Sequence, residues 1–252
     1  MPYAIETRNL TRRFRDLTAV NDLTLAVPEG AIYGFLGLNG AGKTTTIKML
    51  TTLLPATSGT ARVGGYDVAA DPQAVRRIVG LVGDEAGDSR PAWTAREYLT
   101  YFARIRNLER PAAEVEAILD TVDLERPARD RALGGLSTGM KRRVEIARTL
   151  LGRPRVIFLD EPTRGLDLPS KRDVWDFLRD LARDEKVTIF LSSHEVPEIQ
   201  ALCEDLSVIA KGRLTYSGKA RALGADPQTF EDNLIRLLKG QTAAGAEVRA
   251  VA

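Results

Sequence analysis

The sequence predicts an α/β protein in which a mostly parallel sheet forms the core, with an antiparallel β-subdomain before it and a helical subdomain inserted into it. Three patterns indicate this architecture. Residues 3–35 alternate between apolar and polar with a period of two. Further on, apolar runs of strand length alternate with helical patterns, as expected for buried parallel strands. Between about residues 94 and 151 the pattern is helical throughout.

The first part of the chain reads as antiparallel sheet followed by the start of the core. Leu23, Leu25 and Val27 share one face of an extended segment, while the residues between them share the other. A proline, Pro55, closes the first expected helix, because proline cannot continue a helix. The elements expected up to residue 90 are a turn at 28–30, a strand over 32–36 that ends at Gly37, a helix over 44–54, and strands over 61–63 and 78–82.

Helical periodicity marks the middle of the chain, and strands return after residue 155. Tyr98, Phe102 and Ile105 recur at i, i+4 and i+7, which predicts one face of a helix. The Ala- and Gly-rich tail beyond Gly240 is expected to be flexible. The remaining expected elements are a second apolar stripe (Val115, Ile118, Leu119, Val122), strands over 156–159 and 187–191, a helix over 172–183 with Val174, Phe177, Leu178 and Leu181 on one side, and a strand pair, 206–209 and 213–216, around a turn at 211–212.

Composition excludes several classes of protein. The 252 residues carry 36 Lys plus Arg and 34 Asp plus Glu, a net charge of +2, so no concentrated basic face for nucleic acid is expected. No run approaches the roughly 20 apolar residues that span a bilayer, and the first ten residues lack a signal-peptide core, so the chain is expected to be cytoplasmic. A single cysteine, Cys203, lies in an apolar setting and is interpreted as a core residue rather than a nucleophile.

Residues 37–44, Gly-Leu-Asn-Gly-Ala-Gly-Lys-Thr, match the phosphate-binding pattern G-x-x-x-x-G-K-[ST] between an expected strand and an expected helix. The glycines let backbone N–H groups turn toward phosphate oxygens, and the helix N-terminus adds its positive dipole end. Lys43 is expected to reach the β- and γ-phosphates of ATP, and the Thr44 hydroxyl to bind Mg²⁺. The other expected nucleotide contacts in the loop are Asn39, Gly40, Ala41, Gly42 and Thr45.

Two acids follow the apolar strand over 156–159. Burial of that strand places Asp160 and Glu161 at its carboxyl end, where α/β sheets bind ligands. Asp160 is expected to hold Mg²⁺, through water. Glu161 is expected to orient and deprotonate the water that attacks ATP.

These motifs, together with Leu-Ser-Thr-Gly-Met at 136–140, resemble the ABC ATPases, whose signature sequence is similar to Leu-Ser-Gly-Gly-Gln. The segment departs from that signature at Thr138 and Met140. It keeps Ser137 and Gly139, which the family uses on phosphate. Taken alone, Ser137 would also be explained as a plain helix cap. Its position between the phosphate loop and the acidic strand favours the signature.

Three further segments match the family. Residues 165–167, Gly-Leu-Asp, resemble its D-loop, and His194, after Leu-Ser-Ser, resembles its switch histidine, which would act with Lys43 and Glu161 in catalysis. Phe14 lies where the family stacks an aromatic ring on adenine, although a core position is its alternative interpretation. The resemblance covers roughly residues 3–220.

The resemblance implies a P-loop NTPase core of the recombinase-like type, with the antiparallel subdomain and with a helical subdomain over about 88–150. One ATP-binding domain would span 1–220, and 221–252 would form a C-terminal helix and a flexible tail. The family also implies head-to-tail dimers, in which the signature of one copy closes over the phosphates held by the other.

One departure concerns the magnesium site. The family places a glutamine after the strand over 78–82, where this chain has Gly-Asp-Glu-Ala-Gly-Asp at 83–88 and no glutamine. Asp84 is the expected replacement, because a carboxylate oxygen is a hard ligand suited to Mg²⁺.

The resemblance implies an ATPase subunit that docks on an integral-membrane permease, at the inner face of the cell membrane, and drives export of a drug, lipid or other solute. A second copy of the chain is the other expected partner, and nucleic acid is not expected. The alternative is a soluble ABC ATPase in metal-cluster assembly or in work on ribosomes or DNA. A single cassette without a coiled-coil repeat disfavours the ribosome and DNA roles. The transported solute would be selected mainly by the permease.

Overall fold

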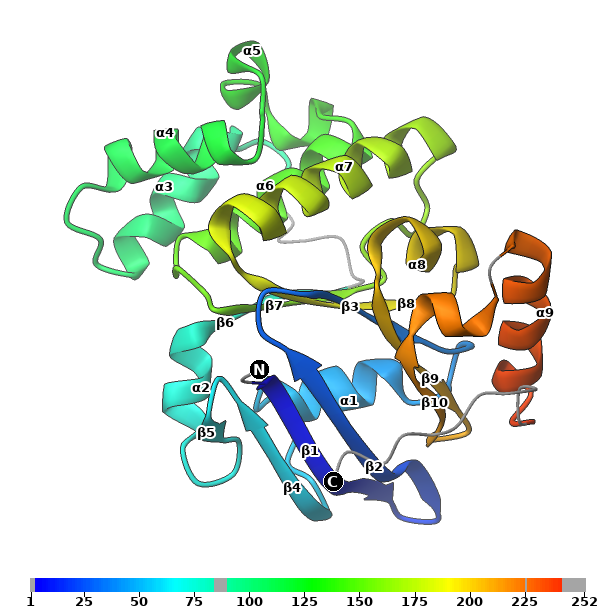
Figure 1. Cartoon of the computed structure of the whole chain (residues 1–252). Coiled ribbons are helices and arrows are strands. Elements are labelled where there is room, and N and C mark those ends of the chain that lie inside the picture. Colours follow the sequence, from blue (N-terminus) through cyan, green and yellow to red (C-terminus); the bar gives the residue numbers. More distant parts are fainter. Residues whose placement is uncertain (1–2, 84–89, 225, 242–252) are drawn as a thin grey trace.

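Two sheets carry the strands of the computed structural model, which describes residues 3–83, 90–224 and 226–241 (Figure 1). A four-stranded antiparallel sheet has the order β2-β1-β4-β5, and a six-stranded sheet has the order β10-β9-β3-β8-β7-β6. The strands are β1 (Tyr3–Phe14), β2 (Leu17–Pro28), β3 (Ile32–Leu36), β4 (Ser58–Val63), β5 (Tyr66–Asp67), β6 (Val79–Val82), β7 (Val156–Asp160), β8 (Thr188–Ser193), β9 (Asp205–Ala210) and β10 (Arg213–Lys219).

The six-stranded sheet is the core. Strands β9, β3, β8, β7 and β6 run parallel, and β10 pairs antiparallel with β9. Helix α1 lies between this sheet and the antiparallel sheet, and α6, α7 and α8 cover the opposite face (Figure 1). The helices are α1 (Lys43–Leu50), α2 (Pro72–Ile78), α3 (Ala95–Ile105), α4 (Pro111–Thr121), α5 (Arg126–Arg129), α6 (Thr138–Leu150), α7 (Leu168–Glu185), α8 (Val196–Leu202) and α9 (Pro227–Leu238), with short 3₁₀ turns at Leu133–Gly135 and Ala220–Leu223.

Two apolar clusters fill the faces of the core sheet. One is shared with α1 and the antiparallel sheet, and the other with the helices of the opposite face. Leu23, Leu25 and Val27 are buried in the first cluster, which confirms the predicted alternation along β2. Cys203 is buried in the second, as expected of a core residue.

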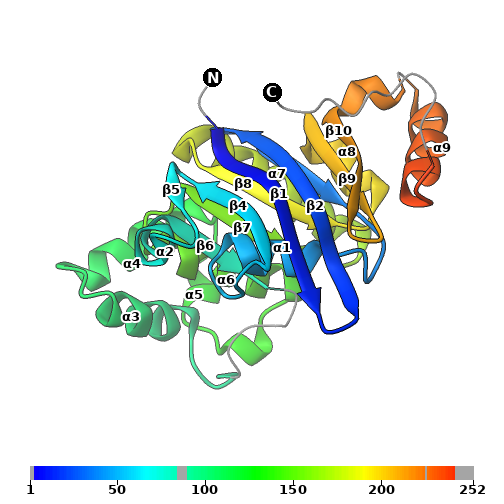
Figure 2. The same cartoon turned by 90° about the horizontal axis from the view of Figure 1, so that it is seen from below.

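Helices α3 and α4 extend to one side of the core, which Figure 2 shows from below. Thr94 begins α3 with a capping box, in which its hydroxyl accepts from Glu97 N–H and the Glu97 carboxylate accepts from Thr94 N–H. Tyr98 is buried, but Ile105 is 57% exposed, so the predicted apolar face of this helix ends before Ile105.

The predicted ends of several elements were wrong by a few residues. Helix α1 stops at Leu50 rather than residue 54, because Thr52 takes a positive φ of 65° that a helix cannot continue through. Helix α7 begins at Leu168 rather than residue 172, because the Asp167 side chain caps it by accepting from Ser170 N–H. Ile78 ends α2 and is not part of β6.

Within the described ranges, no helix combines the length and apolar character needed to cross a membrane. Residues 84–89 and 242–252 lie outside those ranges.

Candidate nucleotide site

The phosphate loop joins the end of β3 to the start of α1. Gly42 caps the helix with φ 113°, and a Cβ on it would lie 2.6 Å from the Ala19 carbonyl oxygen of β2. No side chain caps this helix, so the N–H groups of its first turn remain available to an anion. The Ala41 carbonyl accepts from Gly212 N–H at 2.9 Å, which ties the loop to the β9–β10 turn. The loop is therefore held from two sides.

The Lys43 ammonium group turns back along the loop. Its Nζ donates to the Gly37 carbonyl at 2.7 Å and to the Leu38 carbonyl at 3.3 Å. It also lies 2.9 Å from Oε1 of Glu161, and the two side chains are only 5% and 9% exposed. A buried cation of this kind, beside the backbone N–H groups of the first turn of α1, suits a polyanion such as a nucleoside triphosphate.

Three oxygen-bearing side chains meet at the carboxyl end of β7. The Thr44 hydroxyl donates to Oδ2 of Asp160 at 2.7 Å, and the Ser192 hydroxyl donates to Oδ1 of the same carboxylate at 2.5 Å. Hydroxyl and carboxylate oxygens are the donors that Mg²⁺ prefers, so the chemistry of this group fits that cation. Sequence reasoning did not identify Ser192, although its place at the end of the adjacent strand β8 could have indicated it.

Glu161 follows directly and takes φ 54°, a left-handed conformation that is uncommon for a residue with a side chain. Its N–H donates to the Ser192 carbonyl at 3.2 Å, and its Oε2 lies 2.5 Å from Nδ1 of His194. Oε1 has no hydrogen-bond partner among the described residues, although it forms the ion pair with Lys43. The structure thus brings Lys43, Glu161 and His194 together.

A cavity of about 310 Å³ opens over this group. Phe14 lines it, 40% exposed, so the ring is not a core residue. The Arg12 guanidinium stacks on the Phe14 ring at 4.5 Å from its centroid, and Arg12 does not line the cavity. The ring is therefore supported in a position to present a flat face to a ligand. The other lining residues are Leu17, Ala19, Leu38, Asn39, Gly40, Gly42, Lys43, Thr44, Thr45, Glu161 and Arg164.

Ser137 and Gly139 do not join this group within one chain, since neither lines the cavity. Ser137 begins α6, and its hydroxyl accepts from Met140 N–H at 3.2 Å, so it does serve as a helix cap. Asp84 lies outside the described residues, and the neighbouring Gly83 carbonyl accepts from Arg142 at 2.9 Å. Across the described ranges, no cluster of three or more His, Cys, Asp or Glu residues could hold a metal ion.

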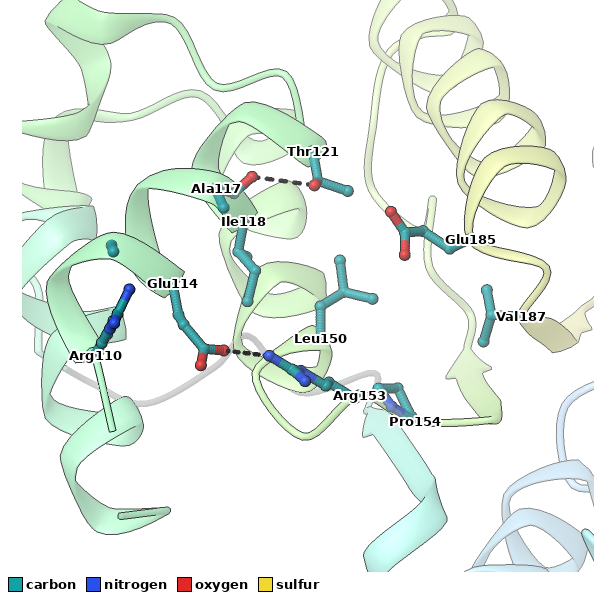
Figure 3. Close-up of a pocket in the computed structure, with 11 residues that line it drawn as sticks. Arg110, Glu114, Ala117, Ile118, Thr121, Leu150, Arg153, Pro154, Glu185 and Val187 are labelled. Carbon is teal, nitrogen blue, oxygen red and sulfur yellow. Dashed lines mark hydrogen bonds and ion pairs between the residues drawn. The ribbon is translucent and has the colours of Figure 1, made fainter. Parts of the chain in front are cut away.

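A larger cavity of about 540 Å³ lies apart from the candidate nucleotide site, between α4, the ends of α6 and α7, and the start of β8 (Figure 3). Glu114 and Arg153 pair across it at 3.2 Å, and Ile118, Leu150 and Val187 supply apolar surface. None of the residues expected to bind nucleotide lines it.

Comparison with known proteins agrees with this geometry. The sequence model of the family described as "ABC transporter" matches residues 20–164, more than half of the chain. The chain belongs to the ABC transporter family. It has the P-loop NTPase fold with the antiparallel and helical parts that were predicted, and it is an ATP-binding, ATP-hydrolysing subunit coupled to transport.

Three bacterial relatives of this ABC transporter subunit match over most of their length. An ABC transporter ATP-binding protein, NatA of Bacillus subtilis, is 37% identical over 93% of this chain and 97% of its own. The daunorubicin/doxorubicin resistance ATP-binding protein of Streptomyces peucetius is 39% identical over 93% and 70%, and a Nod factor export ATP-binding protein of Burkholderia lata is 39% identical over 97% and 85%. A solved cbiO1 subunit from Clostridium perfringens has the same fold, with a TM-score of 0.83 at 22% identity over 95% of this chain and 97% of that one.

Proposed function

We propose that this chain is the ATPase of a bacterial exporter, working as a dimer on a separate integral-membrane permease and located at the inner face of the cell membrane. The names of two relatives, one for drug resistance and one for Nod factor export, support the exporter assignment for this chain. The single observation that carries the ATPase mechanism is the contact of the buried Glu161 carboxylate with both Lys43 and His194.

ATP would bind with its adenine on Phe14 and its phosphates on the backbone N–H groups of residues 39–45. Mg²⁺, held by Thr44 and by Asp160, would neutralise charge that develops on the phosphate oxygens. The γ-phosphate would then take the place of the Glu161 carboxylate as the partner of Lys43. Glu161, once released, would accept the proton of the attacking water while His194 contacts the γ-phosphate.

A second copy of the chain would complete the site. Ser137 and Gly139 lie away from the phosphate loop of their own chain, which is consistent with a role on the nucleotide of the partner copy. Since the Ser137 hydroxyl already accepts from Met140 N–H, its own O–H remains free to donate to a phosphate oxygen.

Asp84 would supply the Mg²⁺ ligand that the family takes from glutamine. Replacement by alanine should raise the Mg²⁺ concentration needed for half-maximal turnover, whereas Asp88→Ala, in the same segment, should not. Equal Mg²⁺ dependence of the Asp84→Ala and unaltered proteins would exclude Asp84 as the ligand.

The transport role is tested by purifying tagged Glu161→Gln protein from its native cell after mild detergent extraction in the presence of ATP. This variant should trap the ATP-bound dimer on its partner. Recovery of a polytopic membrane protein at about one copy per cassette supports the exporter assignment. Lys43→Ala, which lacks the expected phosphate contact, is the control. Recovery of soluble proteins or ribosomes alone would overturn the transport role and leave the ATPase mechanism intact.

A further inference from the structure

A second glutamate, Glu198, is buried behind the proposed site. It lies on α8, the helix that follows His194 and packs against α7 and β8 (Figure 1). The residue is 1% exposed. Its Oε1 accepts from the Thr163 hydroxyl at 2.7 Å and from the Trp175 indole N–H at 3.3 Å.

No ion pair among the described residues reaches Glu198, so its charge is not balanced by a cation. Lys171, in the first turns of α7, pairs with Glu195 rather than with Glu198. Burial raises the pKa of Glu198, and hydrogen bonds from Ser193, Thr163 and Trp175 oppose that shift. A buried carboxyl group of this kind is a poor source of stability, because an apolar side chain of similar volume would pack without a desolvation cost. Its presence therefore calls for a role other than stability.

The partners of Glu198 belong to the two segments that carry the proposed chemistry. Thr163 lies in the loop after Glu161, in which Arg164 N–H donates to the Glu161 carbonyl at 3.2 Å. Ser193, whose hydroxyl also accepts from Glu195 N–H at 3.0 Å, directly precedes His194. One buried carboxyl group, on the helix that begins two residues after His194, is thus hydrogen-bonded to the loop of the proposed base.

An ion pair also joins the two segments that the Glu198 hydrogen bond connects. Lys171, in the first turns of α7, forms its ion pair with Glu195, the residue after His194. Both side chains are mostly buried, 16% and 26% exposed. The stretch from Thr163 to the first turns of α7 is therefore tied to the stretch from His194 to α8 at two points, through the Lys171–Glu195 ion pair and through the Thr163–Glu198 hydrogen bond.

We propose that Glu198 is a positioning residue for hydrolysis, which keeps the loop after Glu161 in register with the segment that ends at His194. This inference rests on the proposed role of Glu161 as the base. A displacement of about 1 Å between reacting groups can lower a rate by about 10²-fold, so a clamp on both segments acts directly on turnover. Binding of ATP, which depends on the phosphate loop, should be nearly independent of it.

The first experiment compares the full chain with Thr163→Val, Glu198→Leu and Glu198→Gln in steady-state ATP hydrolysis. Glutamine keeps an acceptor oxygen for Thr163 and Trp175, so kcat should stay within about threefold. Thr163→Val and Glu198→Leu should lower kcat about tenfold or more, with KM for ATP changed less than about twofold. Thr149→Val is the matched control: its buried hydroxyl donates to the Ile146 carbonyl, far from the site, and its loss should leave kcat unchanged.

A purely structural role for Glu198 gives a different result. Glu198→Leu would then change the unfolding midpoint but leave kcat per folded molecule intact, which would overturn the proposal. If Glu198→Leu does not fold, Thr163→Val and Trp175→Phe each remove a single donor and carry the same test. A glutamine variant as impaired as the leucine variant would also overturn it, because the hydrogen-bond acceptor would then not be what matters.

The second experiment repeats Glu198→Leu in the Glu161→Gln background, with residual turnover followed on radiolabelled ATP. If Glu198 acts through Glu161, the second substitution should lower the residual rate less than about twofold. A full additional tenfold loss would show that Glu198 acts independently and would overturn the proposal. Near-normal turnover of Glu161→Gln alone would instead remove Glu161 as the base, so failure of the proposed function is recognised separately.

Discussion

Lys43 and Glu161 face each other across the carboxyl end of the core sheet, with Nζ 2.9 Å from Oε1 and both side chains nearly buried. The cation expected on the phosphates and the carboxylate expected on the water thus neutralise each other in this state of the protein. A buried pair of this kind is costly to break unless another charge replaces the lost partner. ATP brings such a charge, so nucleotide binding and release of the base are expected to occur together.

Glu161→Gln should bind ATP and turn it over about 10²–10⁴-fold more slowly, since an amide cannot accept the proton of the attacking water. ATP binding, measured with a fluorescent analogue, should be retained or tighter, because the carboxylate no longer competes for Lys43. Steady-state phosphate release measures the turnover. Glu204→Gln, the same change on a side chain that is 93% exposed, is the control. Near-normal phosphate release by Glu161→Gln would assign the base to another group.

Thr44→Val should raise the Mg²⁺ concentration needed for half-maximal ATP hydrolysis. The Thr44 hydroxyl is hydrogen-bonded to Asp160 at 2.7 Å, so valine removes a proposed Mg²⁺ ligand together with a contact that orients the second one. Loss of such a group typically costs about 10–100-fold in metal affinity. A titration of Mg²⁺ at saturating ATP measures the change, with Thr149→Val as the control. Identical Mg²⁺ titrations for the valine variant and the unaltered protein would argue against this site.

Gly42→Ala should damage the phosphate loop far more than Gly40→Ala. Both glycines have positive φ, 113° and 78°, so a Cβ is strained at either position by about 1–2 kcal/mol. At Gly42 the added Cβ would also lie 2.6 Å from the Ala19 carbonyl, whereas nothing lies within 4 Å at Gly40. Urea denaturation and ATP binding measure the two effects. Equal loss in both variants would mean that backbone strain alone, and not the contact with β2, decides the outcome.

The stability of the protein relative to Glu198→Gln should fall as pH rises. Burial raises the pKa of Glu198 above the unfolded value of about 4.3. Between those two values the unfolded chain has lost the proton and the folded chain still holds it, so unfolding becomes easier with increasing pH. The groups around it are Thr163, Trp175, Ser193 and the neighbouring Glu195, whose charge acts in the same direction. Urea denaturation of both proteins from pH 4 upward tests this, and a difference that does not vary with pH would contradict it.

Cys203 should resist thiol reagents in the folded protein. The thiol is 6% exposed, and burial raises its pKa far above the ordinary range, so little thiolate forms. A colorimetric thiol titration should detect it only in denaturant. Rapid labelling without denaturant, at a rate that does not follow global unfolding, would show local opening around α8.

Local patterns indicated the residues that the structure brings together around Lys43. The phosphate loop was identified from its motif and its flanking elements, and the acids after β7 from the apolar strand before them; the alternation of Leu23, Leu25 and Val27 was confirmed. The ends of helices were predicted less well. The φ of 65° at Thr52 and the exposed position of Ile105 depend on how the chain packs around them, which apolar periodicity does not report.

Groups whose role arises only from packing were missed. Ser192 directly follows the strand expected over 187–191, and Glu198 lies outside every element expected from the sequence. The structure shows the first hydrogen-bonded to Asp160 and the second bonded to Thr163, 35 positions earlier in the chain. Asp84 and the proposed action of Ser137 on a partner copy stay predictions, because one depends on residues outside the described ranges and the other on a second chain.

The left-handed backbone at Glu161 has a consequence for how this protein can change over time. Its φ of 54° costs free energy because the Cβ atom clashes with the backbone there; the cost is absent for glycine, which has no Cβ, and smaller for asparagine, whose side chain can hydrogen-bond locally. Substitution at this position can therefore yield a protein with a higher free energy of unfolding that no longer turns over ATP. Selection for stability and selection for ATPase activity oppose each other at this residue, and the glutamate is kept only where activity is under selection.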